Sequence, residues 1–353
     1  MTNILLNLRT FMLALMAFAG PSLGYAQGAP APGKKQLLEF NYGTPLGTYY
    51  AALVAKDLGL YEEAGLAPKF FSFQSGAPML AALKSESLDV ITTGLGTVFA
   101  IGQGIPLKIM YWEIDNGAAE ALVVDPASGI RDYRDLPKAK KIAAPSGTCG
   151  QVSLVLIARK LGINYKDLNV VNIAPPMFAN AFASKSIDAG VAWSPFSLGL
   201  ERSGFKVVNW ASDYTPLGGI CPALTSVRPA FLQKHPDIGV KMLQVRAKAM
   251  SLIAKNPDLA IKAIMNRFSI SREVAQATYD REFSSIPSLE AQIDPSSPAS
   301  LTAPDGGGLA GKLRIASEAL AEAGSIPAPL SQKTIADAVD PSHLVRFLRG
   351  GQK

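Results

Sequence analysis

The sequence predicts an α/β fold of two lobes, each a mostly parallel β-sheet flanked by helices. Two observations support this prediction. The chain has 353 residues, 48% of them hydrophobic, which is enough for two domains with apolar cores. Short β-rich segments also alternate with amphipathic helical segments, a pattern typical of right-handed βαβ units. Because the alternation restarts after residue 116, we expect a second sheet from the second stretch.

The first 26 residues have the layout of a cleaved export signal. A short n-region ends at Arg9, an apolar stretch runs from Phe11 to Gly20, and Pro21 opens a polar turn. The apolar stretch is about half of the roughly 20 residues that a membrane-spanning helix needs. We therefore expect removal of residues 1–26, a linker over 27–36, and an exported mature chain with the bacterial periplasm as its address.

The first stretch of the mature chain contains four predicted strands, at 37–42, 69–73, 89–93 and 106–113. Helices are expected between them at 49–64 and 78–87. Gly65 follows the last apolar position of the first helix, where a glycine commonly ends a helix.

The second stretch repeats the pattern and is followed by a helical tail. Strands are predicted at 121–124, 141–144, 169–173, 189–193 and 206–209, with helices at 150–161, 176–184 and 196–203. After residues 225–228 the pattern changes to consecutive helices. The tail has helices at 229–235, 238–255, 257–268, 271–283 and 309–323, and its Pro-, Ser- and Gly-rich residues 286–308 predict a long surface loop. We expect residues 37–115 and 225–353 to form lobe I and residues 116–224 to form lobe II, with two crossover segments.

Charge and motifs exclude several classes of function. The 34 Lys and Arg residues exceed the 28 Asp and Glu residues, which gives a net charge of +6. These basic residues are dispersed along the chain, whereas a nucleic-acid-binding protein usually has a clustered basic surface. The chain has no phosphate loop and no complete dinucleotide fingerprint. Its two His and two Cys residues lack the spacing of metal ligands. We therefore predict no cofactor and no metal.

The loops that follow the strands are the expected binding region. In open α/β sheets the ligand lies beyond the carboxyl ends of the strands, where loops of two lobes can meet. This rule selects the loops 43–47, 94–97, 112–116, 145–151, 193–196 and 218–221.

Two of these loops have the composition of an anion-binding turn. Residues 145–151 lie between a strand and a helix, where free N–H groups attract a negative ligand and the hydroxyls of Ser146 and Thr148 add donors. Residues 94–97 offer a second such turn. Gly and Ser also begin helices for purely structural reasons, but two such turns on facing lobes favour an anion held between two helix ends.

The cysteine residues leave two interpretations open. Cys149 lies in the predicted anion turn and Cys221 lies near the return crossover, so export favours a disulfide. Bridging requires Cα atoms within about 7 Å, and two small buried thiols are the simpler interpretation. A nucleophilic Cys149 would need a nearby base, and we expect both His235 and His343 on the surface. Trp193 is the aromatic residue most suited to line the cleft, because Ser194-Pro195 ends its strand there.

A run of linked motifs resembles the taurine and aliphatic-sulfonate binding proteins of ABC importers. The resemblance covers nearly all of the mature chain and is more specific for the superfamily than for the ligand. The matching segments, in chain order, are Leu88-Asp89-Val90 before Thr93-Gly94-Leu95-Gly96, then Glu120-Ala121-Leu122-Val123-Val124, Lys141-Ile142-Ala143-Ala144-Pro145, Val171-Asn172-Ile173-Ala174-Pro175-Pro176, Ile187-Asp188-Ala189-Gly190, Ala192-Trp193-Ser194-Pro195 and Lys234-His235-Pro236.

The resemblance implies a monomeric periplasmic receptor with a two-lobe, type II-like binding-protein fold. Such a receptor closes on a small organic anion and delivers it to an ABC permease and its ATPase subunit at the inner membrane. Together with the loop rule, it suggests these ligand-binding residues: Thr44, Pro45, Gly94, Gly96, Thr97, Trp112, Asp115, Ser146, Gly147, Thr148, Cys149, Gly150 and Trp193.

One departure from the family's pattern concerns the ligand. Taurine-binding members have an acidic residue for the amine where this chain has Ala223. Either Glu113 or Asp115 replaces that carboxylate, or the ligand lacks an amine and is an alkyl sulfonate, an aryl sulfonate or an aromatic carboxylate. A receptor for a pyrimidine or another nitrogen compound is the alternative. Related folds also process thiamine-pyrimidine precursors, but the scattered His and Cys residues argue against an enzyme.

Overall fold

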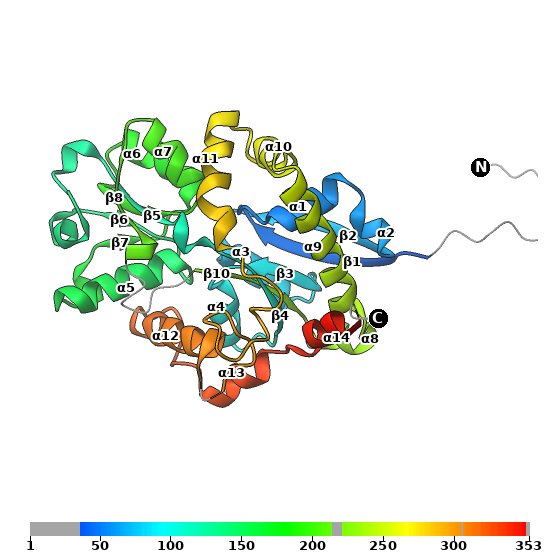
Figure 1. Cartoon of the computed structure of the whole chain (residues 1–353). Helices are drawn as coiled ribbons and strands as arrows, with labels where there is room; N and C mark the ends of the chain where they lie inside the picture. Colours follow the sequence, from blue (N-terminus) through cyan, green and yellow to red (C-terminus); the bar gives the residue numbers. More distant parts are fainter. Residues whose placement is uncertain (1–35, 214–220, 305, 351–353) are drawn as a thin grey trace, which may run out of the picture. The chain divides into compact units, whose positions relative to one another are not determined.

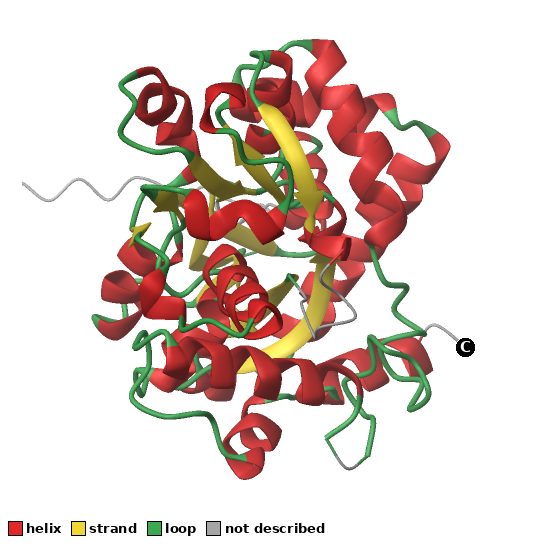
Figure 2. Ribbon diagram, turned by 90° about the vertical axis from the view of Figure 1, so that its left-hand side faces the viewer, coloured by secondary structure: helices red, strands yellow, loops and turns green. Residues whose placement is uncertain are grey.

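The computed structural model describes residues 36–213, 221–304 and 306–350. The predicted export signal and all of the linker except Gln36 lie outside these ranges. Two five-stranded sheets organise the described chain, with helices on both faces (Figures 1 and 2). No helix in the described ranges is long and apolar enough to cross a membrane.

The first sheet has the strand order β2-β1-β3-β10-β4. β1 pairs in parallel with β2 and β3, whereas β10 pairs antiparallel with both β3 and β4. The strands are β1 (Leu38–Pro45), β2 (Leu66–Phe73), β3 (Val90–Thr93), β4 (Lys108–Asp115) and β10 (Pro222–Val227).

The second sheet has the order β7-β6-β8-β5-β9 and repeats this plan. β6 pairs in parallel with β7 and β8, and β5 pairs antiparallel with β8 and β9. The strands are β5 (Ala121–Val124), β6 (Ile142–Ala143), β7 (Val170–Val171), β8 (Ala189–Ala192) and β9 (Lys206–Trp210).

Each sheet is therefore mixed, with four strands in one direction and one strand reversed. The reversed strands, β5 and β10, directly follow the two segments that connect the sheets. A strand that begins at the connection runs away from it, so the other four strands of each sheet end there. The prediction of mostly parallel sheets is confirmed, and the one reversed strand in each sheet brings the strand-end loops of both sheets to one region.

Helices cover the sheets in the order that the sequence predicts. Figure 1 shows α5, α6 and α7 with the second sheet, and α1, α9 and α10 with the first. The α-helices are α1 (Tyr50–Asp57), α2 (Leu60–Glu63), α3 (Gly76–Lys84), α4 (Gly96–Gly102), α5 (Cys149–Leu161), α6 (Phe178–Ala183), α7 (Phe196–Arg202), α8 (Pro229–Lys234), α9 (Ile238–Lys255), α10 (Asp258–Phe268), α11 (Arg272–Glu282), α12 (Gly308–Glu322), α13 (Gln332–Ala338) and α14 (Ser342–Gly350). The 3₁₀ helices include η1 (Asn116–Ala118), η2 (Pro126–Ser128), η3 (Tyr133–Lys138), η4 (Tyr165–Asp167), η5 (Pro175–Met177) and η7 (Phe283–Ser285).

Three local features differ from the sequence prediction. The helix expected over 49–64 is broken at Gly59, whose φ of 68° lies in the left-handed region that glycine adopts easily. The tail has two further helices, α13 and α14. His343, expected on the surface, is buried in the first turn of α14.

In the segment 286–308, predicted as a surface loop, the described residues form a loop that is partly buried against β4. The side chain of Gln292 is fully buried, accepts a hydrogen bond from the Trp112 N–H at 2.7 Å and donates one to the Trp112 carbonyl at 2.9 Å. Because β4 is an edge strand of the first sheet, these backbone groups have no neighbouring strand on that side. The loop thus completes the sheet edge, and its polar composition concealed this role.

A buried ion pair joins the first sheet to the helical tail. Arg246 of α9 and Glu113 of β4 are 4% and 6% exposed, with Nε and Oε2 3.1 Å apart. The guanidinium also donates to the carbonyls of Glu113 and Pro287. The pair therefore fastens both α9 and the start of the 286–308 loop to β4.

We predict that Arg246→Met lowers the free energy of unfolding by about 3–5 kcal/mol, because it leaves the Glu113 carboxylate buried without a partner. Urea denaturation would measure this change. Lys248→Met on the same helix is the matched control, since Lys248 forms an exposed ion pair with Glu63 and its loss should cost less than about 1 kcal/mol. Equal effects of the two substitutions would contradict this account of the α9 anchor.

Candidate functional site

A small cavity lies where loops of both sheets meet. It leaves about 40 Å³ for the centres of water-sized molecules, which is room for a few waters or a small head group. Within the part of the chain that the structure describes, no lining residue carries a charged side chain. The lining residues are Pro45, Gly47, Tyr49, Gly76, Thr93, Gly94, Leu95, Gly96, Asn116, Thr148, Cys149, Trp193 and Cys221. Each of the six loops selected from the sequence contributes at least one residue.

The first turn of α5 forms one wall of this cavity. Thr148 precedes the helix and Cys149 begins it, and both line the cavity. The N–H groups of Cys149 and Gly150 belong to the first turn, where a helix offers them no carbonyl partner and carries partial positive charge. Gly150 also lets the helix approach β8, since a Cβ atom there would lie 3.1 Å from the Val191 Cβ. The wall therefore suits a negative group.

Other polar groups of this turn form hydrogen bonds with protein atoms. The Thr148 hydroxyl donates to the Pro145 carbonyl at 2.6 Å, and the Gly147 N–H donates to Gln151 Oε1 at 2.7 Å. The Ser146 N–H donates to Asn172 Oδ1, and Ser146, Gly147 and Gly150 are not among the residues that line the cavity. The hydroxyl proton of Thr148 is therefore used in a hydrogen bond within the turn. The hydrogen-bond donors that remain for a ligand are backbone N–H groups.

The turn between β3 and α4 forms the opposite wall. Gly94, Leu95 and Gly96 line the cavity, and Gly76 at the start of α3 packs against Gly96. Thr97 is fully buried, and its hydroxyl oxygen has no hydrogen-bond partner among the described residues. A Cβ atom at Gly96 would approach the Thr93 Oγ1 to 3.0 Å, so the small residues keep this wall open.

Three of the sequence-selected residues lie on other cavities. Thr44 lines a neighbouring one beside Arg267. Trp112 and Asp115 line a cavity under the 286–308 loop. Asp115 Oδ1 accepts hydrogen bonds from the N–H groups of Gly117 and Cys221, which ties the two crossover segments together.

Neither carboxylate considered as an amine partner lines the cavity. Asp115 holds the crossover segments together, and Glu113 is paired with Arg246 in the core. The cavity therefore offers an ammonium group no carboxylate among the residues that line it.

Trp193 links the two sheets across the cavity. It follows β8, and its Nε1–H donates to the Leu46 carbonyl, which follows β1, at 2.7 Å. Its indole ring also lines the cavity. The residue thus combines an apolar contact surface with a hydrogen bond between lobes.

A buried carboxyl group strengthens this link. Glu282, at the end of α11, accepts hydrogen bonds from Thr48 at 2.5 Å and Tyr50 at 2.7 Å, and from Ser194. Thr48 and Tyr50 follow β1, whereas Ser194 follows β8, so one carboxyl joins loops of both sheets. Burial raises the pKa of Glu282 to about 7, although the three hydroxyl donors oppose that rise.

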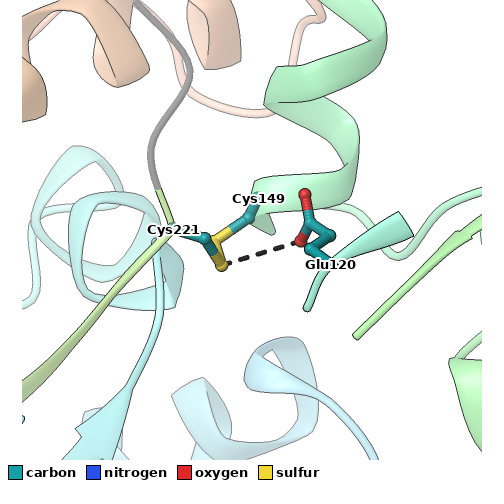
Figure 3. Close-up of side chains that lie close together, drawn as sticks. All are labelled: Glu120, Cys149 and Cys221. Carbon is teal, nitrogen blue, oxygen red and sulfur yellow. Dashed lines mark hydrogen bonds between the residues drawn. A yellow bond between two sulfur atoms is a disulfide. The ribbon is translucent and has the colours of Figure 1, made fainter. Parts of the chain in front are cut away.

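Cys149 and Cys221, which both line the cavity, form a disulfide. Figure 3 shows this bridge. Their Cα atoms are 5.3 Å apart, within the usual range for a disulfide, so the interpretation as two free thiols was wrong. Glu120 lies beside the bridge, with Oε2 3.6 Å from the Cys221 Sγ. The bridge connects the first turn of α5 to the segment that leads into β10.

Comparison with known proteins identifies the family. Residues 48–260 match the family described as NMT1/THI5 like. The chain belongs to this family. A Bacillus subtilis (strain 168) protein named for binding aliphatic sulfonates is 34% identical over 224 residues, which are 61% of this chain and 65% of that protein. The chain thus matches slightly less than two thirds of that relative's length.

Two further proteins are similar to this chain. The taurine-binding periplasmic protein of Escherichia coli (strain K12) is 27% identical over 223 residues, or 63% of this chain and 68% of that protein. The structure of an alkanesulfonate-binding protein from Xanthomonas axonopodis pv. citri, bound to MOPS, superposes with a TM-score of 0.64 at 20% identity, covering 82% of this chain and 98% of that one. The chain therefore has the periplasmic binding protein fold.

Several lining residues of this NMT1/THI5-like protein were not among the sequence-selected site residues. Gly76 follows β2 and obeys the same strand-end rule as the selected loops, so that rule could have found it. Asn116 and Cys221 lie in selected loops, but their residue types alone gave no signal. Tyr49 and Thr93 lie at the ends of predicted elements, where an aromatic or hydroxyl side chain is usually part of the core.

We predict that Glu282 makes the stability of the protein fall as pH rises. The folded pKa of about 7 exceeds the ordinary value of 4.5, so the folded state binds the proton more tightly. This contribution is complete below about pH 4.5 and is lost as pH rises through about 7. Glu282→Gln should flatten this part of the pH profile in urea denaturation, and Glu290→Gln at an exposed position should not. An unchanged profile in Glu282→Gln would contradict the assignment.

Proposed function

We propose that the chain is an exported solute-binding receptor of an ABC importer, which holds a small organic anion of sulfonate type between its lobes and delivers it to a membrane permease. The observation that carries the proposal is a cavity between two facing strand-to-helix turns, with no charged side chain among the residues that line it. The names of the sulfonate- and taurine-binding relatives support the same ligand class.

Electrostatics favour an anion over a cation in this cavity. The first-turn N–H groups of α5 carry partial positive charge in a site with little water, where their attraction for an anion is strong. The rings of Tyr49 and Trp193, with Pro45 and Leu95, suit an apolar organic part. Since no carboxylate of the described residues lines the cavity, the preferred ligand is a monoanion without an ammonium group, which disfavours taurine.

The contacts between lobes suit a receptor that closes on its ligand. The Trp193–Leu46 hydrogen bond and the Glu282 cluster join loops of the two sheets beside the cavity. We infer that residues 37–115 with 225–353 and residues 116–224 are the bodies that separate when the cavity opens. The closed form then presents both lobes to the permease and its ATPase subunit.

Ethanesulfonate should raise the melting temperature and bind with micromolar affinity or tighter, whereas taurine should bind at least tenfold more weakly. The reason is that the amine of taurine finds no acidic partner in the cavity. A thermal-shift screen followed by calorimetry measures both affinities. A shift with a pyrimidine and with none of the anions would contradict the proposal.

Asn116→Asp should weaken ethanesulfonate binding at least tenfold. The aspartate side chain has nearly the same size as the asparagine side chain but adds a negative charge, which repels the anion in the cavity. Asn180→Asp is the matched control, since it adds the same charge at an exposed position of α6. Calorimetry compares the two variants with the wild type. Similar affinities for ethanesulfonate in both variants would mean that the anion binds elsewhere.

A further inference from the structure

The disulfide is the most chemically reactive group that borders the cavity. Both of its residues line the cavity, although each is only 4% exposed. Gly94 lies directly against it, because a Cβ atom at that position would be 3.3 Å from the Cys149 Sγ and 3.9 Å from the Cys221 Sγ. Because Gly94 also lines the cavity and has no side chain, the space beside the sulfur atoms that a Cβ atom would occupy stays open to a small molecule.

Glu120 places an acid beside the bridge. Its side chain is fully buried, and Oε1 accepts a hydrogen bond from Ser153 Oγ at 3.0 Å. Oε2 lies 3.6 Å from the Cys221 Sγ, and because a disulfide sulfur carries no hydrogen, Glu120 is the residue that donates in this contact when its carboxyl is protonated. Among the described residues Glu120 forms no salt bridge, and a buried carboxyl without a cation favours its neutral form.

The groups around Glu120 also favour its protonated form. Burial raises the pKa of Glu120 to about 8, the Ser153 hydrogen bond opposes this, and the negative charge of Asp115 adds to the rise. Cys149 and Cys221 do not titrate while they are bridged. At neutral pH the carboxyl group therefore carries a proton.

We propose that the Cys149–Cys221 disulfide is a thiol-reducible modification site that opens into the cavity, and that Glu120 is the proton donor to the departing sulfur. The substrate class is a small dithiol. Its thiolate attacks the Cys149 Sγ, the S–S bond breaks, and the electron pair passes to the Cys221 Sγ, which takes the proton from Glu120 Oε2. A mixed disulfide on Cys149 is the product of this step.

The second thiol of the reductant completes the reaction. As a thiolate it attacks the reductant's own sulfur in the mixed disulfide, and Cys149 leaves as a thiolate that takes a proton from water. Two electrons and two protons pass from the dithiol to the protein, and the reductant leaves as a cyclic disulfide. Glu120 regains its proton from solvent.

Reduction would alter the cavity itself, and this consequence rests on the proposed function. The bridge holds the first turn of α5, which offers its N–H groups to the anion, to the segment that leads into β10 of the other sheet. Without the bridge this wall is free to move, so the reduced receptor should bind its anion more weakly. The site would couple capture of the solute to the thiol–disulfide balance of the surroundings.

The test is the rate of reduction by dithiothreitol in the absence of any ligand. It is measured as alkylated Cys149 and Cys221 in acid-quenched samples by mass spectrometry and divided by the thiolate concentration at each pH. For the wild type this normalised rate should fall above about pH 8, as Glu120 loses its proton. Glu120→Gln should be at least tenfold slower at pH 7, and its normalised rate should not change with pH. Glu290→Gln, which removes a carboxyl at an exposed position outside the cavity, should follow the wild type. A Glu120→Gln rate and pH profile equal to those of the wild type would overturn the proposal.

A second variant keeps the test decisive if Glu120→Gln fails to fold. Ser153→Ala removes the hydrogen bond that favours the ionised carboxylate, so the fall in normalised rate should move to higher pH. A fall at the same pH as in the wild type would overturn the role of Glu120.

The link to solute capture is tested separately. The Cys149→Ser/Cys221→Ser double variant should bind ethanesulfonate at least tenfold more weakly than the oxidised wild type. Equal affinity would overturn the coupling between the bridge and the anion-binding wall. If the wild type binds none of the anions in the screen, the proposed function fails, whereas the reduction kinetics still decide whether Glu120 serves the disulfide.

Discussion

The structure depends on the reversal of one strand in each sheet. β5 and β10 start at the crossover segments, so the other strands of both sheets finish where the chain crosses. Turns that are distant in sequence, such as Gly94–Gly96 and Thr148–Cys149, consequently line one cavity. Asp115 and Asn116 then bind the second crossover through Cys221, which fixes the base on which those turns face each other.

No charged side chain lines the cavity among the described residues, and the acidic residues nearest to it are buried. Glu120 and Glu282 are fully buried next to lining residues, and burial raises the pKa of each carboxyl to about 8 and about 7. Hydroxyl groups, rather than cations, satisfy their oxygen atoms. In its protonated form Glu282 joins loops from both sheets without adding a negative charge beside the cavity.

Local patterns in the sequence predicted the elements well. β5 coincides with its predicted residues, and α9 spans its predicted range, because strand alternation and helical periodicity are properties of neighbouring residues. The loops around the cavity followed from the strand-end rule. The committed hydroxyl of Thr148, the Gln292 contact with β4 and the Cys149–Cys221 bridge depend on residues far apart in sequence, so no local pattern could reveal them.

The central claim is that backbone N–H groups of two facing turns hold the anion. The most direct measurement is a titration of the ¹⁵N-labelled protein with ethanesulfonate, followed through the amide signals in an NMR spectrum. The account predicts saturable shifts of the Cys149 and Gly150 amides together with those of Leu95 and Gly96. Saturable binding that leaves these four signals in place and moves amides elsewhere would contradict it.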